Sequence, residues 1–317
     1  MAHRSSRQTA FLGIALILIT ADAAVLTPFP ETAPATTKDM DHIGIRAALA
    51  RDARYATWPT ASTTGIPYRL DPGYTTAESG IITQALTQIQ TDMNQCIRFV
   101  LYNNATHSGQ DNIYFGRTFN NGVTPGTCFS FPGRNVAQAG RGQKLAMFSG
   151  VDGCLSSVKE AMGFIVKVLG LRNELQRPDR ATAVQVFLQN IKPTLRNLNI
   201  LQQYTANQVD FSNTAFDFNS ITIPAPEKYA ISGLVLYTSA VSGRPVGGTL
   251  PRLSLGDCQG IALLYPTVCV STACVDPYVN GGVTAVPPVT AATFGPGVPV
   301  PLDPGTASGV QPIDITP

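Results

Sequence analysis

The chain has 317 residues, of which 13% are charged, and its formal net charge is +2 at pH 7. This length allows one large core or two smaller lobes. The small net charge gives no sign of a polyanionic partner, so we expect no nucleic acid to bind.

The first 23 residues are typical of a secretory signal peptide. Arg4 and Arg7 supply positive charge, residues 10–19 form an apolar run, and Ala21 to Ala23 offer a cleavage site with small residues. The apolar run is too short to span a bilayer unaided. No later segment is long and apolar enough for a membrane helix. We therefore expect a secreted, extracellular protein without a stable membrane span.

The composition divides the remaining chain into three parts. Residues 24–46 are rich in Pro, Thr and Ala, which predicts a propeptide-like leader. Residues 47–274 have a globular composition and are expected to form one domain. Residues 275–317 are rich in Pro, Gly, Val and Thr, and they predict a disordered tail or stalk.

Within the globular part, hydrophobic periodicity predicts strands and two long helices. Residues 66–70 indicate an edge strand, because Pro67 cannot donate to a strand ladder. Apolar residues at helical spacing predict a first helix over 78–98. The other predicted elements are strands at 112–115 and 144–148 and a helix over 156–171 that Ser156 or Ser157 caps and Gly170 ends.

The cysteines and one sequon agree with an extracellular location. Six cysteines fit an oxidising compartment, and fifteen pairings of them are possible. Asn104 begins an Asn-Ala-Thr acceptor for N-glycosylation in a polar segment.

Residues 154–180 resemble the active-site helix of the astacin family of peptidases, a branch of the metzincins. In that family H-E-x-x-H-x-x-G-x-x-H-E is followed by R-x-D-R. Gly170, Glu174 and residues 177–180 keep this frame. The positions that carry the chemistry differ. The three His positions hold Gly163, Lys167 and Asn173, and the general-base position holds Phe164. The family's Met-turn, S-I-M-H-Y, corresponds to residues 220–224, where Thr222 replaces Met and Pro224 replaces Tyr.

Further segments extend the resemblance from Trp58 to Cys269. They are residues 58–59, 66–68, 96–99, 130–133, 142–143, 217–221 and 253–257. The resemblance implies an α+β fold with two lobes about a cleft. The N-terminal lobe would hold a twisted sheet and two long helices.

The resemblance also implies that the zinc site is degenerate. Gly163 has no side chain, the amide of Asn173 is a poor zinc donor, and Lys167 would place a cation where the ion should lie. Phe164 cannot act as a general base. We therefore expect no catalytic residue, no metal ligand and no cofactor, with zinc present only if unrecognised ligands recruit it.

Other residues take roles from the family. The resemblance implies disulfides Cys96–Cys269 and Cys128–Cys154, which leaves Cys258 and Cys274 for a third bridge. Glu174 would anchor a new N-terminus, Ala47, after cleavage behind Arg46. The substrate-pairing edge strand would consist of Gln143, Lys144, Leu145, Ala146 and Met147, and it is either open to peptides or covered by another part of the chain such as the tail.

Two remaining groups offer alternative chemistry. His107 is the one histidine in the expected domain, and an exposed loop position is favoured over a catalytic role. Glu160 and Lys167 lie two turns apart on one helix face, so a carboxylate–ammonium arrangement is possible, although a solvated face is commoner.

These observations predict a secreted, catalytically inactive astacin-like protein that binds an extracellular protein or peptide without hydrolysis. A first alternative is a zinc metalloendopeptidase with unconventional ligands. A second is a structural extracellular protein whose tail mediates interactions.

Overall fold

The computed structural model describes residues 49–50, 53–59, 61, 64–118, 125–205, 208–210, 215–269 and 274–278. The chain divides into two compact units, Met1–His42 and Ile43–Pro317, and every described residue belongs to the second. The predicted signal peptide and leader, and the tail beyond residue 278, lie outside the described residues.

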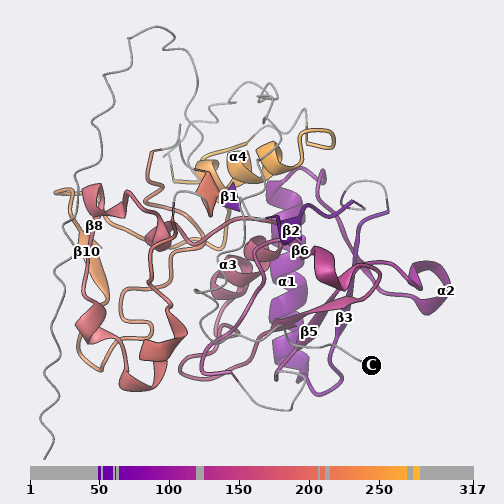
Figure 1. The fold of residues 1–317 in the computed structure, drawn as a ribbon, viewed down its shortest axis with the longest axis horizontal. Helices are drawn as coiled ribbons and strands as arrows, with labels where there is room; N and C mark the ends of the chain where they lie inside the picture. The colour runs from indigo at the N-terminus through magenta and orange to yellow at the C-terminus, as the bar shows by residue number, and fades with distance from the viewer. Residues whose placement is uncertain are drawn as a thin grey trace, which may run out of the picture. The chain divides into compact units, whose positions relative to one another are not determined.

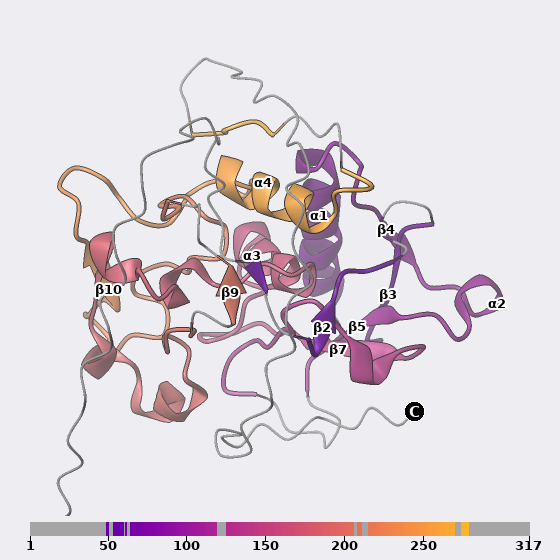
Figure 2. The same cartoon turned by 45° about the horizontal axis from the view of Figure 1, so that its top comes forward.

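A four-stranded parallel sheet in the order β4-β3-β5-β7 is the framework of the N-terminal lobe (Figures 1 and 2). Its strands are β3 (Ile66–Leu70), β4 (Phe99–Leu101), β5 (Asn112–Gly116) and β7 (Gly142–Ala146).

The predicted edge position of β3 is wrong, because β3 lies between β4 and β5. Pro67 is in register with Val100 of β4, whereas pairing with β5 begins one residue later, at Tyr68. Pro67 therefore precedes the first residue of β3 that pairs with β5. A proline is tolerated in an interior strand when it lies near the start of the strand in this way.

Two long helices cover one face of this sheet. Helix α1 (Thr76–Asp92) begins with a capping box between Thr75 and Glu78. It ends earlier than the predicted residue 98, because Asn94 and Gln95 take left-handed φ values of 48° and 62°. Helix α3 (Val158–Val168) is capped by Ser157, and Gly170, with φ 119°, turns the chain after it.

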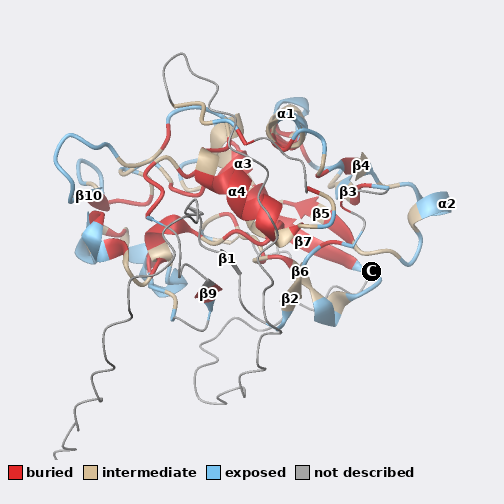
Figure 3. Ribbon diagram, turned by 90° about the horizontal axis from the view of Figure 1, so that it is seen from above, coloured by how far each residue is buried: buried red, intermediate tan, exposed pale blue. Residues whose placement is uncertain are grey.

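A third helix, α4 (Leu255–Leu264), is apolar around most of its circumference and is buried, as Figure 3 shows. Two side chains from outside α3 hold its C-terminal end. The Trp58 indole N–H donates to the Val168 carbonyl at 2.7 Å, and the hydroxyl of Tyr265, the residue that ends α4, donates to the Leu169 carbonyl at 3.0 Å. These two bonds satisfy carbonyls that a helix C-terminus otherwise leaves unpaired.

Two hydrophobic clusters correspond to the two lobes. One contains residues of the sheet and of α1, α3 and α4, such as Ile82, Phe115, Met162 and Ile261. The other is built from residues 175–237, which have little regular structure. The remaining elements are β1 (Leu49–Ala50), β2 (Tyr55–Ala56), α2 (Asn104–His107), β6 (Arg134–Asn135), η1 (Val136–Gln138), η2 (Glu174–Gln176), η3 (Arg180–Thr182), β8 (Val184–Val186), η4 (Leu188–Asn190), η5 (Pro193–Leu198), β9 (Val209–Asp210) and β10 (Tyr237–Ser239).

Three disulfides connect the domain: Cys96–Cys269, Cys128–Cys154 and Cys258–Cys274. These are the pairs named in the sequence analysis. The chain continues on the domain past Cys274, because the Tyr278 hydroxyl accepts the Leu250 N–H at 3.3 Å. Residues 275–278, predicted as the start of a disordered tail, therefore pack against the domain.

Across the described residues, no helix has the length and apolar character needed to cross a bilayer.

Candidate functional site

Helix α3 presents one partly accessible stripe. Glu160, Phe164 and Lys167 are four and three residues apart, which places them on the same helix face. All three are partly buried, whereas the other residues from 161 to 168 are fully buried. The stripe includes the positions that the resemblance assigns to the general base and to one zinc ligand.

Gly163 lies where α3 contacts the turn at residues 220–224. A Cβ atom at this position would be 2.6 Å from the Ile221 carbonyl oxygen, closer than such atoms approach in proteins. One turn earlier, the Lys159 ammonium donates to the Ile223 carbonyl at 3.3 Å. The backbone of the turn therefore occupies the space that a side chain at position 163 would need.

The Lys167 ammonium lies over the Phe164 ring, 4.2 Å from its centroid. Burial lowers the pKa of Lys167 to about 8. The described residues supply no ion-pair partner to this ammonium. The site therefore holds one cation that is stabilised by an aromatic ring. No carboxylate among the described residues pairs with it.

Asn173 and Thr222 are both buried, and both have local structural partners. The Asn173 side chain accepts the Leu175 N–H at 3.0 Å and so caps η2. The Thr222 hydroxyl accepts the Glu174 N–H at 3.1 Å and lies 2.8 Å from the Ser220 hydroxyl. These side chains hold the chain segments to one another.

A fully buried carboxylate, that of Asp257 in α4, holds the turn against α3. It accepts the Ile221 N–H at 2.7 Å and the Ser220 hydroxyl at 2.8 Å, together with the Ser254 N–H at 3.1 Å. Burial raises the pKa of Asp257, and these hydrogen bonds oppose that rise. Sequence reasoning missed this role. The Ser-x-x-Asp spacing of residues 254–257 signals a helix cap but not the second contact.

Glu174 is also buried and already has a cationic partner. Its carboxylate accepts from the Arg177 guanidinium at 3.1 Å and from the Asp217 N–H at 2.8 Å. Ala47, the residue expected to bring an N-terminal ammonium here, lies outside the described residues. The anchoring role of Glu174 stays a prediction.

The edge expected to pair with peptides is occupied. Every residue of β7 is buried, and so is Met147. Phe129 forms an antiparallel bridge with Ala146, exchanging hydrogen bonds of 2.8 and 3.0 Å. The Gln143 amide binds Asn135 and Gly133 at 2.7 and 2.8 Å. Of the two alternatives for residues 143–147, an open or a covered edge, these contacts favour the covered one, with the segment around Phe129 alongside.

The alternative catalytic groups are also engaged. The Nδ1 atom of His107 accepts the Asn103 N–H at 2.8 Å. Glu160 pairs with Lys228 at 2.8 Å and accepts from Ser156 at 2.6 Å, so its partner is not Lys167. Pro224, the last of the altered positions, provides its carbonyl to the Tyr237 hydroxyl.

Asn104 is exposed at the first turn of α2, on a part of the chain that Figure 1 shows extending away from the sheet. This exposure suits N-glycosylation. We expect protein secreted from animal cells to lose mass when treated with an N-glycosidase and the Asn104→Gln variant to show no loss. Asn103→Gln keeps the acceptor intact and should behave as the wild type. Equal masses before and after treatment would contradict the prediction.

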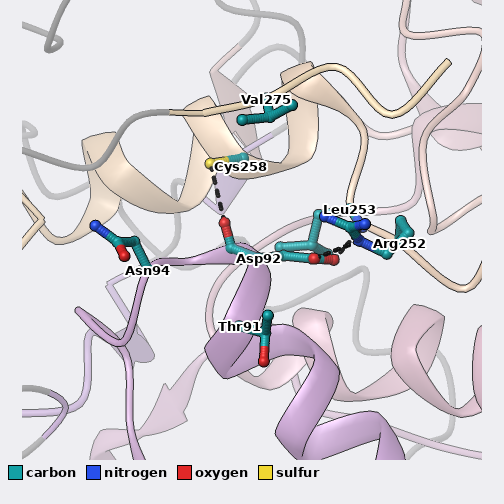
Figure 4. Close-up of a pocket in the computed structure, with 7 residues that line it drawn as sticks. All are labelled: Thr91, Asp92, Asn94, Arg252, Leu253, Cys258 and Val275. Carbon is teal, nitrogen blue, oxygen red and sulfur yellow. Dashed lines mark hydrogen bonds and ion pairs between the residues drawn. The ribbon is translucent and has the colours of Figure 1, made fainter. Parts of the chain in front are cut away.

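A cavity of about 250 Å³ lies at the end of α1 (Figure 4). Its central carboxylate, Asp92, accepts from Arg252 at 2.5 Å, from Gln88 at 2.8 Å and from the Leu253 N–H at 2.7 Å. Cys258 forms another wall. The described residues around this cavity therefore already satisfy its carboxylate, and the cavity shares no lining residue with the α3 stripe.

Comparisons with known proteins identify the fold. The model of the peptidase family Astacin matches residues 50–265. Tolloid-like protein 2 of Mus musculus is 27% identical over 249 residues, which are 77% of this chain and 22% of that protein's length. High choriolytic enzyme 1, a hatching enzyme zinc-protease from Oryzias latipes (medaka fish), is similar with a TM-score of 0.50 and 24% identity over 67% of this chain and 94% of that chain. The predicted α+β, two-lobed metzincin fold is confirmed.

These findings contradict the expectation of no cofactor. The family points to zinc as the cofactor. The residues at the corresponding positions do not fit that ion, because the Ile221 carbonyl lies against Gly163 and Lys167 contributes a cation. The described part of the chain contains no group of three or more His, Cys, Asp or Glu residues able to hold a metal.

Proposed function

Because the chain belongs to the astacin family of peptidases, we propose that it uses this fold as a secreted domain that binds a protein or peptide without hydrolysing it. The domain corresponds to residues 47–274 of the sequence, behind a signal peptide and a leader. The tail follows it.

The contact between Gly163 and the Ile221 carbonyl is the observation that supports this proposal best. It fills the place of one zinc ligand with backbone, and Asp257 fixes that backbone through hydrogen bonds of 2.7 and 2.8 Å. Phe164, at the general-base position, has no group that can take a proton from water. The altered residues therefore form a packed structure of their own, and it serves stability in place of hydrolysis.

Peptide binding requires groups that remain accessible. Phe164 and Lys167 offer an apolar ring and one positive charge side by side on the α3 stripe. In an antiparallel pair, alternate residues direct their backbone groups to opposite sides. Since Phe129 bonds to Ala146, its neighbour Ser130 directs its backbone groups outward. A peptide would add as a strand there rather than at residues 143–147.

The three disulfides support secretion, since such bonds persist in oxidising compartments. No described cysteine is free. The partner is accordingly an extracellular protein or peptide.

The test compares hydrolysis and binding in the same secreted, full-length preparation. A fluorogenic peptide library and casein are incubated with the protein in zinc-containing buffer, with and without 1,10-phenanthroline, while metal analysis measures the zinc content per chain. We expect no chelator-sensitive turnover and selective retention of some sequences from a displayed peptide library.

Two results would overturn the proposal. Chelator-sensitive hydrolysis that co-purifies with the chain would indicate a working metalloendopeptidase. Failure to retain any library sequence above the level of a denatured, reduced sample would remove the binding role. Zinc bound to the chain without chelator-sensitive hydrolysis would be inert and would leave the proposal standing, whereas zinc together with such hydrolysis would indicate a working centre.

A further inference from the structure

The face of the sheet opposite α1 holds a row of cationic and aromatic side chains. Arg69, Tyr114 and Lys144 are in register on the neighbouring strands β3, β5 and β7. Their neighbours along each strand, such as Ile113, Phe115 and Leu145, point into the core instead. The Arg69 guanidinium lies 4.6 Å from the Tyr102 ring centroid and 5.7 Å from that of Tyr114, and the Lys144 ammonium lies 5.8 Å from the Tyr114 centroid.

Two glycines make room for this row. A Cβ atom at Gly142 would lie 2.8 Å from Nη2 of Arg69, and one at Gly116 would lie 2.7 Å from Cε of Lys144. Neither glycine has a left-handed backbone, so conformation does not require them. The small residues instead let both long side chains lie flat across the strands, on either side of Tyr114.

The two cations lack an acidic partner within the row. Arg69 donates to the Asn112 amide oxygen at 3.1 Å. The nearby carboxylate, Asp71, accepts the Tyr114 hydroxyl at 2.8 Å. Lys144 is 9% exposed; burial lowers its pKa, and the charge of Asp71 opposes part of that lowering without forming an ion pair. Among the described residues neither cation forms an ion pair, so an external anion would relieve the cost of the buried charge.

We propose that Arg69, Tyr114 and Lys144 form a binding site for an acidic polysaccharide. The site lies on a sheet face, where the sheet itself already uses the backbone hydrogen bonds. A peptide gains affinity mainly by pairing with a strand edge, which this face does not offer. A polysaccharide is instead recognised by its sulfate or carboxylate groups and by the C–H groups on one face of its sugar rings, which suit two cations about an aromatic ring. This site is separate from the α3 stripe and does not depend on the proposed peptide binding.

Isothermal titration calorimetry with heparin, at two salt concentrations, tests the proposal on the secreted full-length protein. We expect Arg69→Gln and Lys144→Gln each to weaken binding about tenfold, as expected for loss of one charge-assisted hydrogen bond. Arg98→Gln is the matched control, because Arg98 is exposed beside β4 and outside the row. It should weaken binding less than about threefold, because an exposed charge outside the row contributes only screened, long-range attraction.

Gly142→Ala separates geometry from net charge. Its methyl group would displace the Arg69 guanidinium without altering the charge, and binding should fall several-fold. Thermal melting of each variant establishes that it is folded. Absence of heparin binding by the wild type, or equal losses in the Arg69 and Arg98 variants, would overturn the proposal. Equal binding of a polyglutamate peptide would overturn the choice of a polysaccharide.

Discussion

Adding a single methyl group to Gly163 should destabilise the protein by about 2–3 kcal/mol. Glycine to alanine within a helix ordinarily stabilises by about 0.5–1 kcal/mol, because glycine gives up more backbone entropy on folding. At position 163 the new Cβ atom would lie 2.6 Å from the Ile221 carbonyl oxygen. Overpacking costs of about 1–3 kcal/mol are usual when side chains can adjust. Here the opposing atom belongs to backbone that Asp257 holds in place, so we expect the upper part of that range.

Gly80 is the matched control. It also lies within a helix, α1, but a Cβ atom there would have no neighbour within 4 Å. Urea denaturation of both variants should therefore show opposite signs, with Gly80→Ala more stable than the wild type and Gly163→Ala less stable. If Gly163→Ala were as stable as Gly80→Ala, the turn at residues 220–224 would not occupy the ligand position, and the main support for the proposed function would be lost.

Replacing Lys167 by methionine should stabilise the protein by about 2 kcal/mol at pH 7. The ammonium is partly buried over Phe164, and burial lowers the pKa of Lys167 from 10.5 to about 8. At about 1.36 kcal/mol per pH unit, this difference corresponds to about 3 kcal/mol of unfavourable burial. Residual solvent screening and the lost cation–π contact reduce the gain. Methionine has a similar length and carries no charge, so it removes the cost while it keeps the packing.

The stabilisation should depend on pH in a defined window. Below about pH 8 Lys167 is charged in both the folded and the unfolded chain, so the burial penalty is fully present. Between about pH 8 and 10.5 the unfolded chain binds more protons than the folded one, and wild-type stability therefore rises with pH. The gap between wild type and Lys167→Met should thus close across this window.

Thermal melting at several pH values measures this effect, and the shift at pH 7 should be about 4–8 °C. Lys228→Met is the contrasting control, because Lys228 has an ion-pair partner in Glu160 at 2.8 Å. That variant should be less stable than the wild type. A Lys167→Met variant that melts below the wild type at pH 7 would show that the ammonium has a favourable partner.

Much of the fold was predictable because each element leaves a local signal. The strand at residues 66–70 and the Ser157 cap of α3 follow from residues adjacent in sequence. The same local reasoning placed β3 at an edge, since Pro67 lacks a donor. Only the register with β5, which starts at Tyr68, shows why an interior position is tolerated.

The expected peptide-binding edge shows a second limit. Residues 143–147 have the composition of a strand, but whether a strand is an edge depends on what lies beside it. Phe129, from a different segment, takes the outer position by bonding to Ala146. No pattern within residues 143–147 records that neighbour.

The sequence by itself determined which donors are missing from the family's zinc positions, because the identity of a side chain needs no structure: Gly163, Lys167 and Asn173 are not the family's imidazoles, and Phe164 is not a base. The tertiary structure alone decided what replaced them. The Ile221 carbonyl and the Asp257 carboxylate belong to distant segments that packing brings against α3. The distances between these groups and their burial depend on how the whole core packs. The chemical groups at a position can therefore be read from the sequence, but whether backbone from a distant segment fills the space beside that position cannot.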